Sequence, residues 1–217
     1  MHGHILHGDV CEINVMWQRT LNGRVIAILH DWDISSSTPD SFHSNNTTVA
    51  TCIRIGTGPS LAVRLQQAAG ESNRPPERRH HHDLESLFWL LVRAVLHFDL
   101  DNKRRLKTKL PRWEGGWAAA AQEKKTFLKD AEAFVEVMKH ALPLYRGLIT
   151  PWVVRLMRIF RRAYDAAMIE TFDAGGDFVV RFDEEIYAEE ISFERFLHAI
   201  EEEEGREKAM KRLSEEQ

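Results

Sequence analysis

The chain of 217 residues is long enough to bury a sizeable core and is most simply one domain with an appended tail. Its charged content of 29% is ordinary for a globular protein, and its net charge of −4 gives no general attraction to nucleic acid or anionic membranes. Two cysteines, Cys11 and Cys52, are too few for a disulfide scaffold, and no apolar stretch has the length of a membrane span. We therefore expect a soluble intracellular protein, in the cytoplasm or nucleus, that binds neither nucleic acid nor membrane.

The first predicted element is a β-hairpin near the start of the chain. Apolar runs at residues 13–17 and 24–30 flank the pair Asn22-Gly23, which predicts a turn because both residues tolerate a positive φ angle. Within the second run, Val25–Leu29 are five consecutive apolar residues. Such a run is typical of a strand that is buried on both faces.

Asp9, Asn14 and Asp31 stand at the two ends of this hairpin. Because a hairpin brings its ends together, we expect the three side chains to converge at one edge. Oxygen ligands without Cys or His suit a hard cation such as Mg²⁺, which keeps several waters and shares phosphate oxygens. The residue types therefore predict a magnesium site.

The remainder of the chain is predicted to be mainly helical. Residues 34–51 are rich in Ser, Thr, Asn, Asp and Pro, and this composition predicts a mobile loop. The strongest helix signal runs from Asp83 to about His97; it is apolar on nearly every side, as in a buried helix, and Asp83 is a candidate N-cap. The other predicted helices cover residues 61–69, 117–129, 130–142, 151–170 (Thr150 as N-cap, Pro151 at the first position) and 192–200 (Ser192 as N-cap).

Two groups of histidines raise the question of zinc: His2, His4 and His7, and the run His80-His81-His82. Neither group has other zinc ligands at a suitable spacing. We interpret the first group as alternate residues of a short strand and the second as part of a basic loop.

The order and spacing of several motifs resemble the catalytic core of the protein-kinase-like superfamily and, more narrowly, the fungal-type protein kinase family. The motifs are a catalytic loop at His7-Gly8-Asp9 with Asn14 five residues on, a D-F-G-like Asp31-Trp32-Asp33, an activation-segment end at Arg54-Ile55-Gly56-Thr57-Gly58, and a central helix opening at His82-Asp83-Leu84-Glu85. The resemblance covers about residues 4–170.

The resemblance implies roles for individual residues. Asp9 is expected to be the catalytic base, and Asn14 and Asp31 to bind Mg²⁺. His7 and Asp83 are expected to support the site structurally, His7 by packing against the Asp31 region and Asp83 by accepting hydrogen bonds from the catalytic-loop backbone. The implied cofactors are Mg²⁺ and ATP, although no nucleotide-binding residue is identified, and the implied partner is a protein substrate or a partner kinase lobe.

The implied fold is mainly α, a kinase-like C-terminal helical lobe with a short β-hairpin and without an N-terminal β-lobe. We expect this lobe over residues 1–170, with Thr57 in its activation segment, a helix-containing extension over 171–200 and a charged, disordered tail over 201–217. Only eight residues precede Asp9, and the chain contains no six-residue Gly-rich loop or strand Lys of the kinase type. The expected protein is therefore a truncated serine/threonine kinase domain that is inactive alone and binds Mg²⁺ and ATP weakly.

Three positions depart from the usual kinase pattern. Gly8 stands where many kinases have Arg, Cys11 where they often have a phosphate-contacting Lys, and Arg64 where a Glu usually anchors the end of the activation segment. The ion pair of that Glu is therefore not expected in this chain.

Two other functions remain open. Small-molecule phosphotransferases of the aminoglycoside and choline kinase type share the pattern at His7-Gly8-Asp9 and Asp31-Trp32, whereas Thr57 and the helix that Asp83 leads are protein-kinase features. A non-catalytic helical interaction module would instead use the apolar surface where an N-terminal lobe would pack. The amount of nucleotide bound per chain separates this module from both kinds of kinase.

Overall fold

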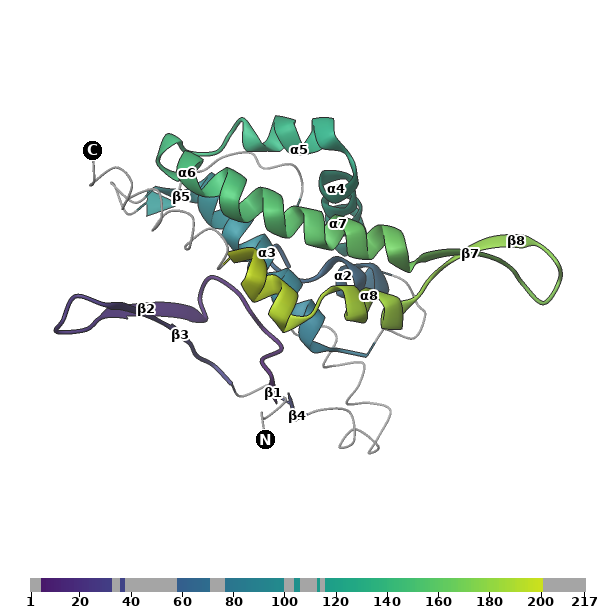
Figure 1. The fold of residues 1–217 in the computed structure, drawn as a ribbon, viewed down its shortest axis with the longest axis horizontal. Coiled ribbons are helices and arrows are strands. Elements are labelled where there is room, and N and C mark those ends of the chain that lie inside the picture. Colours follow the sequence, from purple (N-terminus) through teal and green to yellow (C-terminus); the bar gives the residue numbers. More distant parts are fainter. Residues whose placement is uncertain are drawn as a thin grey trace, which may run out of the picture. The chain divides into compact units, whose positions relative to one another are not determined.

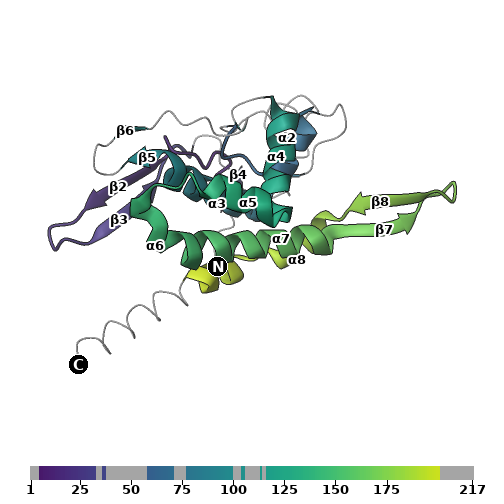
Figure 2. The ribbon, with the colours of Figure 1, turned by 90° about the horizontal axis from the view of Figure 1, so that it is seen from above.

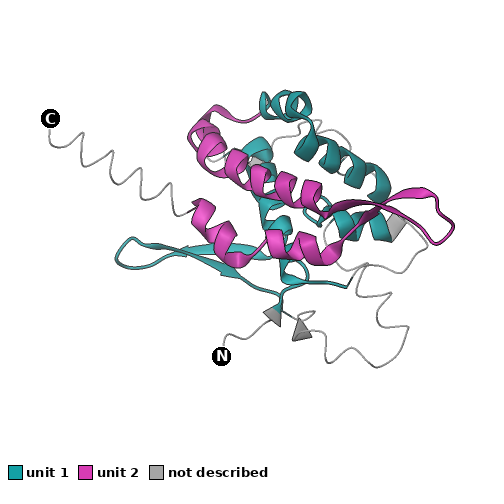
Figure 3. Cartoon of the chain, turned by 45° about the vertical axis from the view of Figure 1, so that its right-hand side comes forward, with its two compact units in different colours: residues 1–140 teal, residues 141–217 magenta. Residues whose placement is uncertain are grey.

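The computed structural model describes residues 5–32, 36–37, 58–70, 77–99, 104–105, 113 and 116–200. The described residues are mainly helical, as predicted. They belong to two compact units, residues 1–140 and residues 141–217 (Figure 3). Thr57, most of the predicted loop at 34–51 and the predicted tail at 201–217 lie outside the described residues.

Among its described residues, the first unit contains four longer helices: α2 (Val63–Gly70), α3 (His80–His97), α4 (Trp117–Lys129) and α5 (Ala131–Met138). The predicted helix over 117–129 is confirmed, whereas α5 ends four residues before the predicted 142. Helix α3 begins at His80, so Asp83 lies in its first turn and is not the N-cap. The N–H of the capping residue Arg79 donates instead to Nδ1 of His82, at 3.0 Å.

Helix α3 forms the centre of an aromatic core. The ring centroid of Trp89 lies 5.1 Å from that of Trp113 and 5.6 Å from that of Phe127 on α4. Phe127 in turn lies 5.1 Å from Phe134 on α5. Edge-on and tilted aromatic pairs at these distances are favourable beyond the area that they bury. Burial on most sides of α3 is what its sequence predicts, and Phe88, Trp89 and Val92 are fully buried.

The predicted hairpin is present as β2 (Val15–Arg19) and β3 (Val25–Leu29), which pair antiparallel with Arg19 opposite Val25. Gly23 adopts a φ of +81°, while Asn22 does not need a positive φ. The N–H of Gly23 donates to the carbonyl of Thr20, and the N–H of Thr20 donates to the carbonyl of Arg24. This is a three-residue loop with its glycine in the left-handed position.

The prediction that Val25–Leu29 is buried on both faces is wrong. Val25 is 52% exposed and Ile26 37%, and on the paired strand Trp17 is 68% exposed. In Figure 1 the two strands extend away from α3. A run of apolar residues predicts a strand whose side chains are stabilised by burial under other elements. The pattern does not show whether those elements belong to the same chain.

Two shorter strand pairs also lie in the described part of the first unit. Strand β1 (Ile5–Leu6) pairs with β4 (Ser36–Ser37), and β5 (Phe98–Asp99) pairs with β6 (Arg104–Arg105). The first of these pairs joins the residues just before His7 to residues just beyond Asp31.

The described residues of the second unit, 141–200, form helices and a hairpin. Its elements are η2 (Pro143–Tyr145), α6 (Arg146–Leu148), the π-helical η3 (Ile149–Val154), α7 (Arg155–Ala167), β7 (Met168–Phe172), β8 (Phe178–Phe182), α8 (Glu184–Glu190) and a helix over 193–200. The ring of Tyr164 on α7 packs at 5.1 Å from that of Tyr187 on α8 and at 5.3 Å from that of Phe182. Ser192 caps the last helix as predicted, because its Oγ accepts from the N–H of Arg195 at 3.2 Å.

One prediction for the second unit is wrong. The helix expected over 151–170 has its α-helical part at Arg155–Ala167, and Thr150 and Pro151 lie inside the π-helical turn. Strands β7 and β8 pair over five residues each and extend from the end of α7 (Figure 2). Their turn is held by Asp173, whose Oδ1 accepts from the N–H groups of Gly175 and Asp177, both at 2.9 Å.

Among the described residues, no helix has both the length and the apolar character that crossing a membrane requires.

Candidate functional site

The backbone of residues 7–9 is fixed by the carboxylate of Asp83 in the first turn of α3. Its Oδ2 accepts from the N–H of His7 at 2.8 Å, and both of its oxygens lie 3.3 Å from the N–H of Gly8. Arg78 lies 3.7 Å from the same carboxylate, whose side chain is 14% exposed. Gly8 adopts a φ of +85°, a conformation that side chains disfavour, and this gives a structural reason for glycine where many kinases have Arg.

The imidazole of His7 joins this loop to the end of the hairpin. The N–H of Asp9 donates to Nδ1 of His7 at 3.2 Å, so the ring proton is on Nε2, which donates to the carbonyl of His30 at 2.9 Å. The ring also makes an edge contact with Trp32, with 4.6 Å between the centroids. His7 is buried, and its two hydrogen bonds hold the segments before Asp9 and before Asp31 in a fixed arrangement.

The side chain of Asn14 is oriented by Asp9. Its Nδ2 donates to the backbone carbonyl of Asp9 at 2.9 Å and approaches Oδ2 of the Asp9 carboxylate at 3.3 Å. Because both partners are oxygens, only the NH₂ end of the amide can face Asp9. The amide oxygen of Asn14 therefore points away from Asp9, where it can coordinate a cation or accept a hydrogen bond.

Asp31 follows the hairpin in an uncommon backbone conformation. Its φ is +67°, whereas its neighbour His30 is still paired with the hairpin, since the N–H of His30 donates to the carbonyl of Asn14 at 2.9 Å. Left-handed φ values are unfavourable for residues with a side chain, although Asp tolerates them better than most, and they cluster at functional sites. The Asp31 side chain is exposed.

The donors supplied by Asp9, Asn14 and Asp31 are two carboxylates and one amide oxygen, which fit Mg²⁺ by their chemistry. The structure brings Asp9 and Asn14 into direct contact and places Asp31 one residue from the backbone pair of Asn14 and His30. Their joint ligation of one ion stays a prediction. Thr57 lies outside the described residues.

Two further residues next to the loop contribute to its packing, and of these Glu12 was not identified from the sequence. Cys11, at the position of the usual phosphate-contacting Lys, is fully buried. Glu12 is partly exposed and lies 3.7 Å from Arg93, a largely buried residue of α3. The signal for this pair was available, since a single Arg interrupts an otherwise apolar helix and a buried Arg requires a partner.

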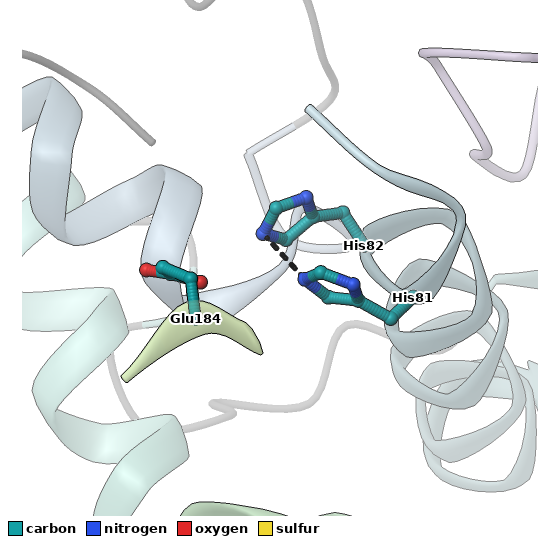
Figure 4. Close-up of side chains that lie close together, drawn as sticks. All are labelled: His81, His82 and Glu184. Carbon is teal, nitrogen blue, oxygen red and sulfur yellow. Dashed lines mark hydrogen bonds between the residues drawn. The ribbon is translucent and has the colours of Figure 1, made fainter. Parts of the chain in front are cut away.

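The predicted basic loop at His80–His82 is instead the first turn of α3. His82 lies 3.2 Å from His81, nitrogen to nitrogen (Figure 4). Burial holds the pKa of His82 well below its usual range, and the charges of His81, Arg78, Arg64 and Arg79 lower it further. His82 thus closes the start of the helix as an uncharged ring, since its Nδ1 accepts from Arg79.

Comparison with known proteins bears on the first part of the chain. Residues 1–95 match the family model described as fungal protein kinase, a segment that contains His7, Asp9, Asn14, Asp31 and Asp83. The family that the sequence motifs predicted is therefore confirmed for this segment, which is less than half of the 217 residues. No curated protein and no solved structure matches the chain.

Proposed function

From the fungal protein kinase segment at residues 1–95, we propose that this chain carries the magnesium and catalytic-base part of an ATP-dependent phosphotransfer site for protein hydroxyl groups. Asp9 is the base that accepts the proton of the hydroxyl, and Asn14 and Asp31 bind the Mg²⁺ that accompanies ATP. Bound Mg²⁺ would neutralise charge on the phosphates. By itself the 217-residue chain binds the nucleotide weakly and is inactive as a kinase, whether as a pseudoenzyme or as one half of a site completed by a partner lobe.

The observation that carries this proposal is the set of contacts around His7 and Asn14. The ring of His7 ties Asp9 to His30, and the amide of Asn14 is held on Asp9. Together they support a geometry in which a base and two metal ligands from separate segments face one ion. A chance cluster of polar groups on a surface would not be expected to include a buried histidine whose two ring nitrogens bond to two separate segments, as those of His7 do.

A binding experiment tests the metal assignment. Calorimetric titration of the purified chain with a non-hydrolysable ATP analogue, carried out with and without Mg²⁺, should show weak binding that requires Mg²⁺. Asp31→Asn keeps a residue that tolerates a positive φ but removes a charged ligand, and should weaken the Mg²⁺-dependent binding by about tenfold or more. Asp165→Asn, an exposed change on α7, is the matched control and should bind as the parent chain does. Equal binding by Asp31→Asn and the parent chain would remove Asp31 from the site.

A small-molecule phosphotransferase would use the same three residues, so this titration does not distinguish it from a protein kinase. The two classes are distinguished by the acceptor that each one uses. If an aminoglycoside or choline stabilises the complex of the chain with the nucleotide, and protein substrates do not, the small-molecule class is favoured.

A non-catalytic interaction module is supported by a different observation, the exposed apolar surface of the β2–β3 hairpin. Ile13 is 72% exposed, Trp17 68% and Met16 49%, and adjacent apolar side chains with this exposure are typical of protein contact sites. A chain with this function would bind no nucleotide in the calorimetric titration, with or without Mg²⁺.

A further inference from the structure

The segment that leads into α2 is held by buried polar side chains. Residues 60–63 are all buried, and this segment follows the predicted activation segment directly. Gln66 donates through Nε2 to the carbonyl of Gly58, and the N–H of Leu61 lies 3.4 Å from the same carbonyl. These contacts are local to the segment and to the helix that follows it. Side chains of two other helices make two longer-range contacts with the same segment.

The first long-range contact is made by Lys124 on α4. Its Nζ donates to the backbone carbonyl of Leu61 at 2.6 Å, 63 residues earlier in the chain. The same Nζ lies 4.9 Å from the ring centroid of Trp89 on α3. Lys124 is fully buried, and an ammonium group in that position is costly unless other groups compensate it.

The second contact is made by Glu85 on α3. Its Oε1 accepts from the backbone N–H of Val63 at 2.9 Å and from Nε1 of Trp89 at 3.0 Å. Glu85 is also fully buried. Its charge acts on Lys124 in the favourable direction and raises the pKa of the amine, against the larger effect of burial, which lowers that pKa to about 7. The groups that face Lys124 are thus Glu85 and Trp89 of α3 and the Leu61 carbonyl ahead of α2.

We propose that Glu85 and Lys124 are positioning residues that clamp the backbone at Leu61 and Val63 onto α3 and α4, and so fix the end of the activation segment in the proposed kinase site. The clamp binds one carbonyl and one N–H two residues apart, which fixes both the position and the direction of the segment. Arg64 stands where a Glu usually makes the anchoring ion pair, and the clamp supplies an anchor from two other helices. Calling residues 58–66 the end of an activation segment rests on the proposed function, whereas the contacts of Glu85 and Lys124 are independent of that function.

Hydrogen–deuterium exchange tests the clamp. In Lys124→Met, which keeps a long unbranched side chain but removes the donor, exchange over residues 58–66 should be about tenfold faster or more, because the bound backbone loses a buried partner. Exchange over α5, residues 131–138, should stay within about twofold of the parent chain. Lys129→Met, an exposed lysine at the end of the same helix, is the matched control and should leave both regions unchanged. Unchanged exchange over 58–66, or equal acceleration of both regions, would overturn the proposal.

A pH series on the unmodified chain keeps the proposal testable even if Lys124→Met does not fold. Burial lowers the pKa of Lys124 from its ordinary value of 10.5 to about 7 in the closed state, and exposure of the amine to water on opening should return the pKa toward the ordinary value. Between these values the closed state holds one proton fewer, so raising the pH stabilises closure. Protection of residues 58–66, corrected for the intrinsic exchange rate, should rise between pH 7.5 and 8.5 by up to about tenfold, the limit for one proton. No rise beyond that of residues 131–138 would count against the clamp.

Neither measurement uses a nucleotide. Loss of Mg²⁺-dependent nucleotide binding with an intact clamp would remove the proposed function alone, and normal binding without the exchange effect would remove the clamp alone.

Discussion

Incubated with labelled ATP, Mg²⁺ and generic protein substrates, the purified 217-residue chain is expected to transfer no measurable phosphate to them. Phosphoryl transfer depends on positioning and charge neutralisation, and the sequence of this chain contains neither the six-residue Gly-rich loop nor the strand Lys that hold the phosphates in kinases. The loss of one such electrostatic contact lowers a rate by about 10²–10³-fold, and here several are missing together.

The control for this assay is Asp9→Ala, which removes the proposed base. If the parent chain does phosphorylate substrates and Asp9→Ala does not, the inactive-lobe hypothesis is refuted and the chain is a working kinase. Phosphorylation that persists in Asp9→Ala would point to a contaminating enzyme in the preparation.

Asp83→Ala is expected to lower the free energy of unfolding by about 2–6 kcal/mol. The change leaves the N–H groups of His7 and Gly8 without their acceptor, and each buried donor without a partner costs about 1–3 kcal/mol. For a protein of this size the loss corresponds to a fall in melting temperature on the order of 10 °C. Thermal melts followed by circular dichroism measure it directly.

Asp9→Ala serves as the comparison for Asp83→Ala, because Asp9 is half-buried in the same segment and its carboxylate lies 3.3 Å from the amide nitrogen of Asn14, not on the backbone N–H groups of His7 and Gly8 that Asp83 binds. Its melting temperature should fall by a few degrees at most. If Asp83→Ala melts like the parent chain, the carboxylate does not support the loop, and the structural role assigned to Asp83 fails.

The elements that the sequence predicted well are those decided by local signals. Helix α3 follows from a largely apolar pattern, and the β2–β3 turn follows from Asn22-Gly23, whose glycine does adopt a positive φ. The contact between Asp83 and residues 7–8 could be anticipated only through the kinase resemblance, since nothing in the spacing of residues 76 positions apart predicts a hydrogen bond.

The elements that were missed depend on non-local interactions. Met168 and Ile169 continue an apolar helical pattern, and their strand conformation is decided by pairing with Phe182 and Arg181 across a turn. Helix α8 had a local signal, because Asp183 accepts from the N–H groups of Glu185 and Ile186 as an N-cap, but only seven residues follow it. Glu85 and Lys124 are ordinary helix residues in sequence, and their burial is set by how α2, α3 and α4 pack.

The long span between His7 and Asp83 has a consequence for how the protein folds. The two residues are separated by 76 positions, so their bond requires closure of a long chain segment, at an entropic cost about 2–3 kcal/mol larger than that of a local contact. Helix α3, by contrast, can nucleate from contacts within its own turns. The loop that carries Asp9 should therefore become ordered late in folding, after α3 offers its first turn as a docking point. During synthesis this loop is made before Asp83, so its bond to Asp83 cannot form until residue 83 has been added to the chain.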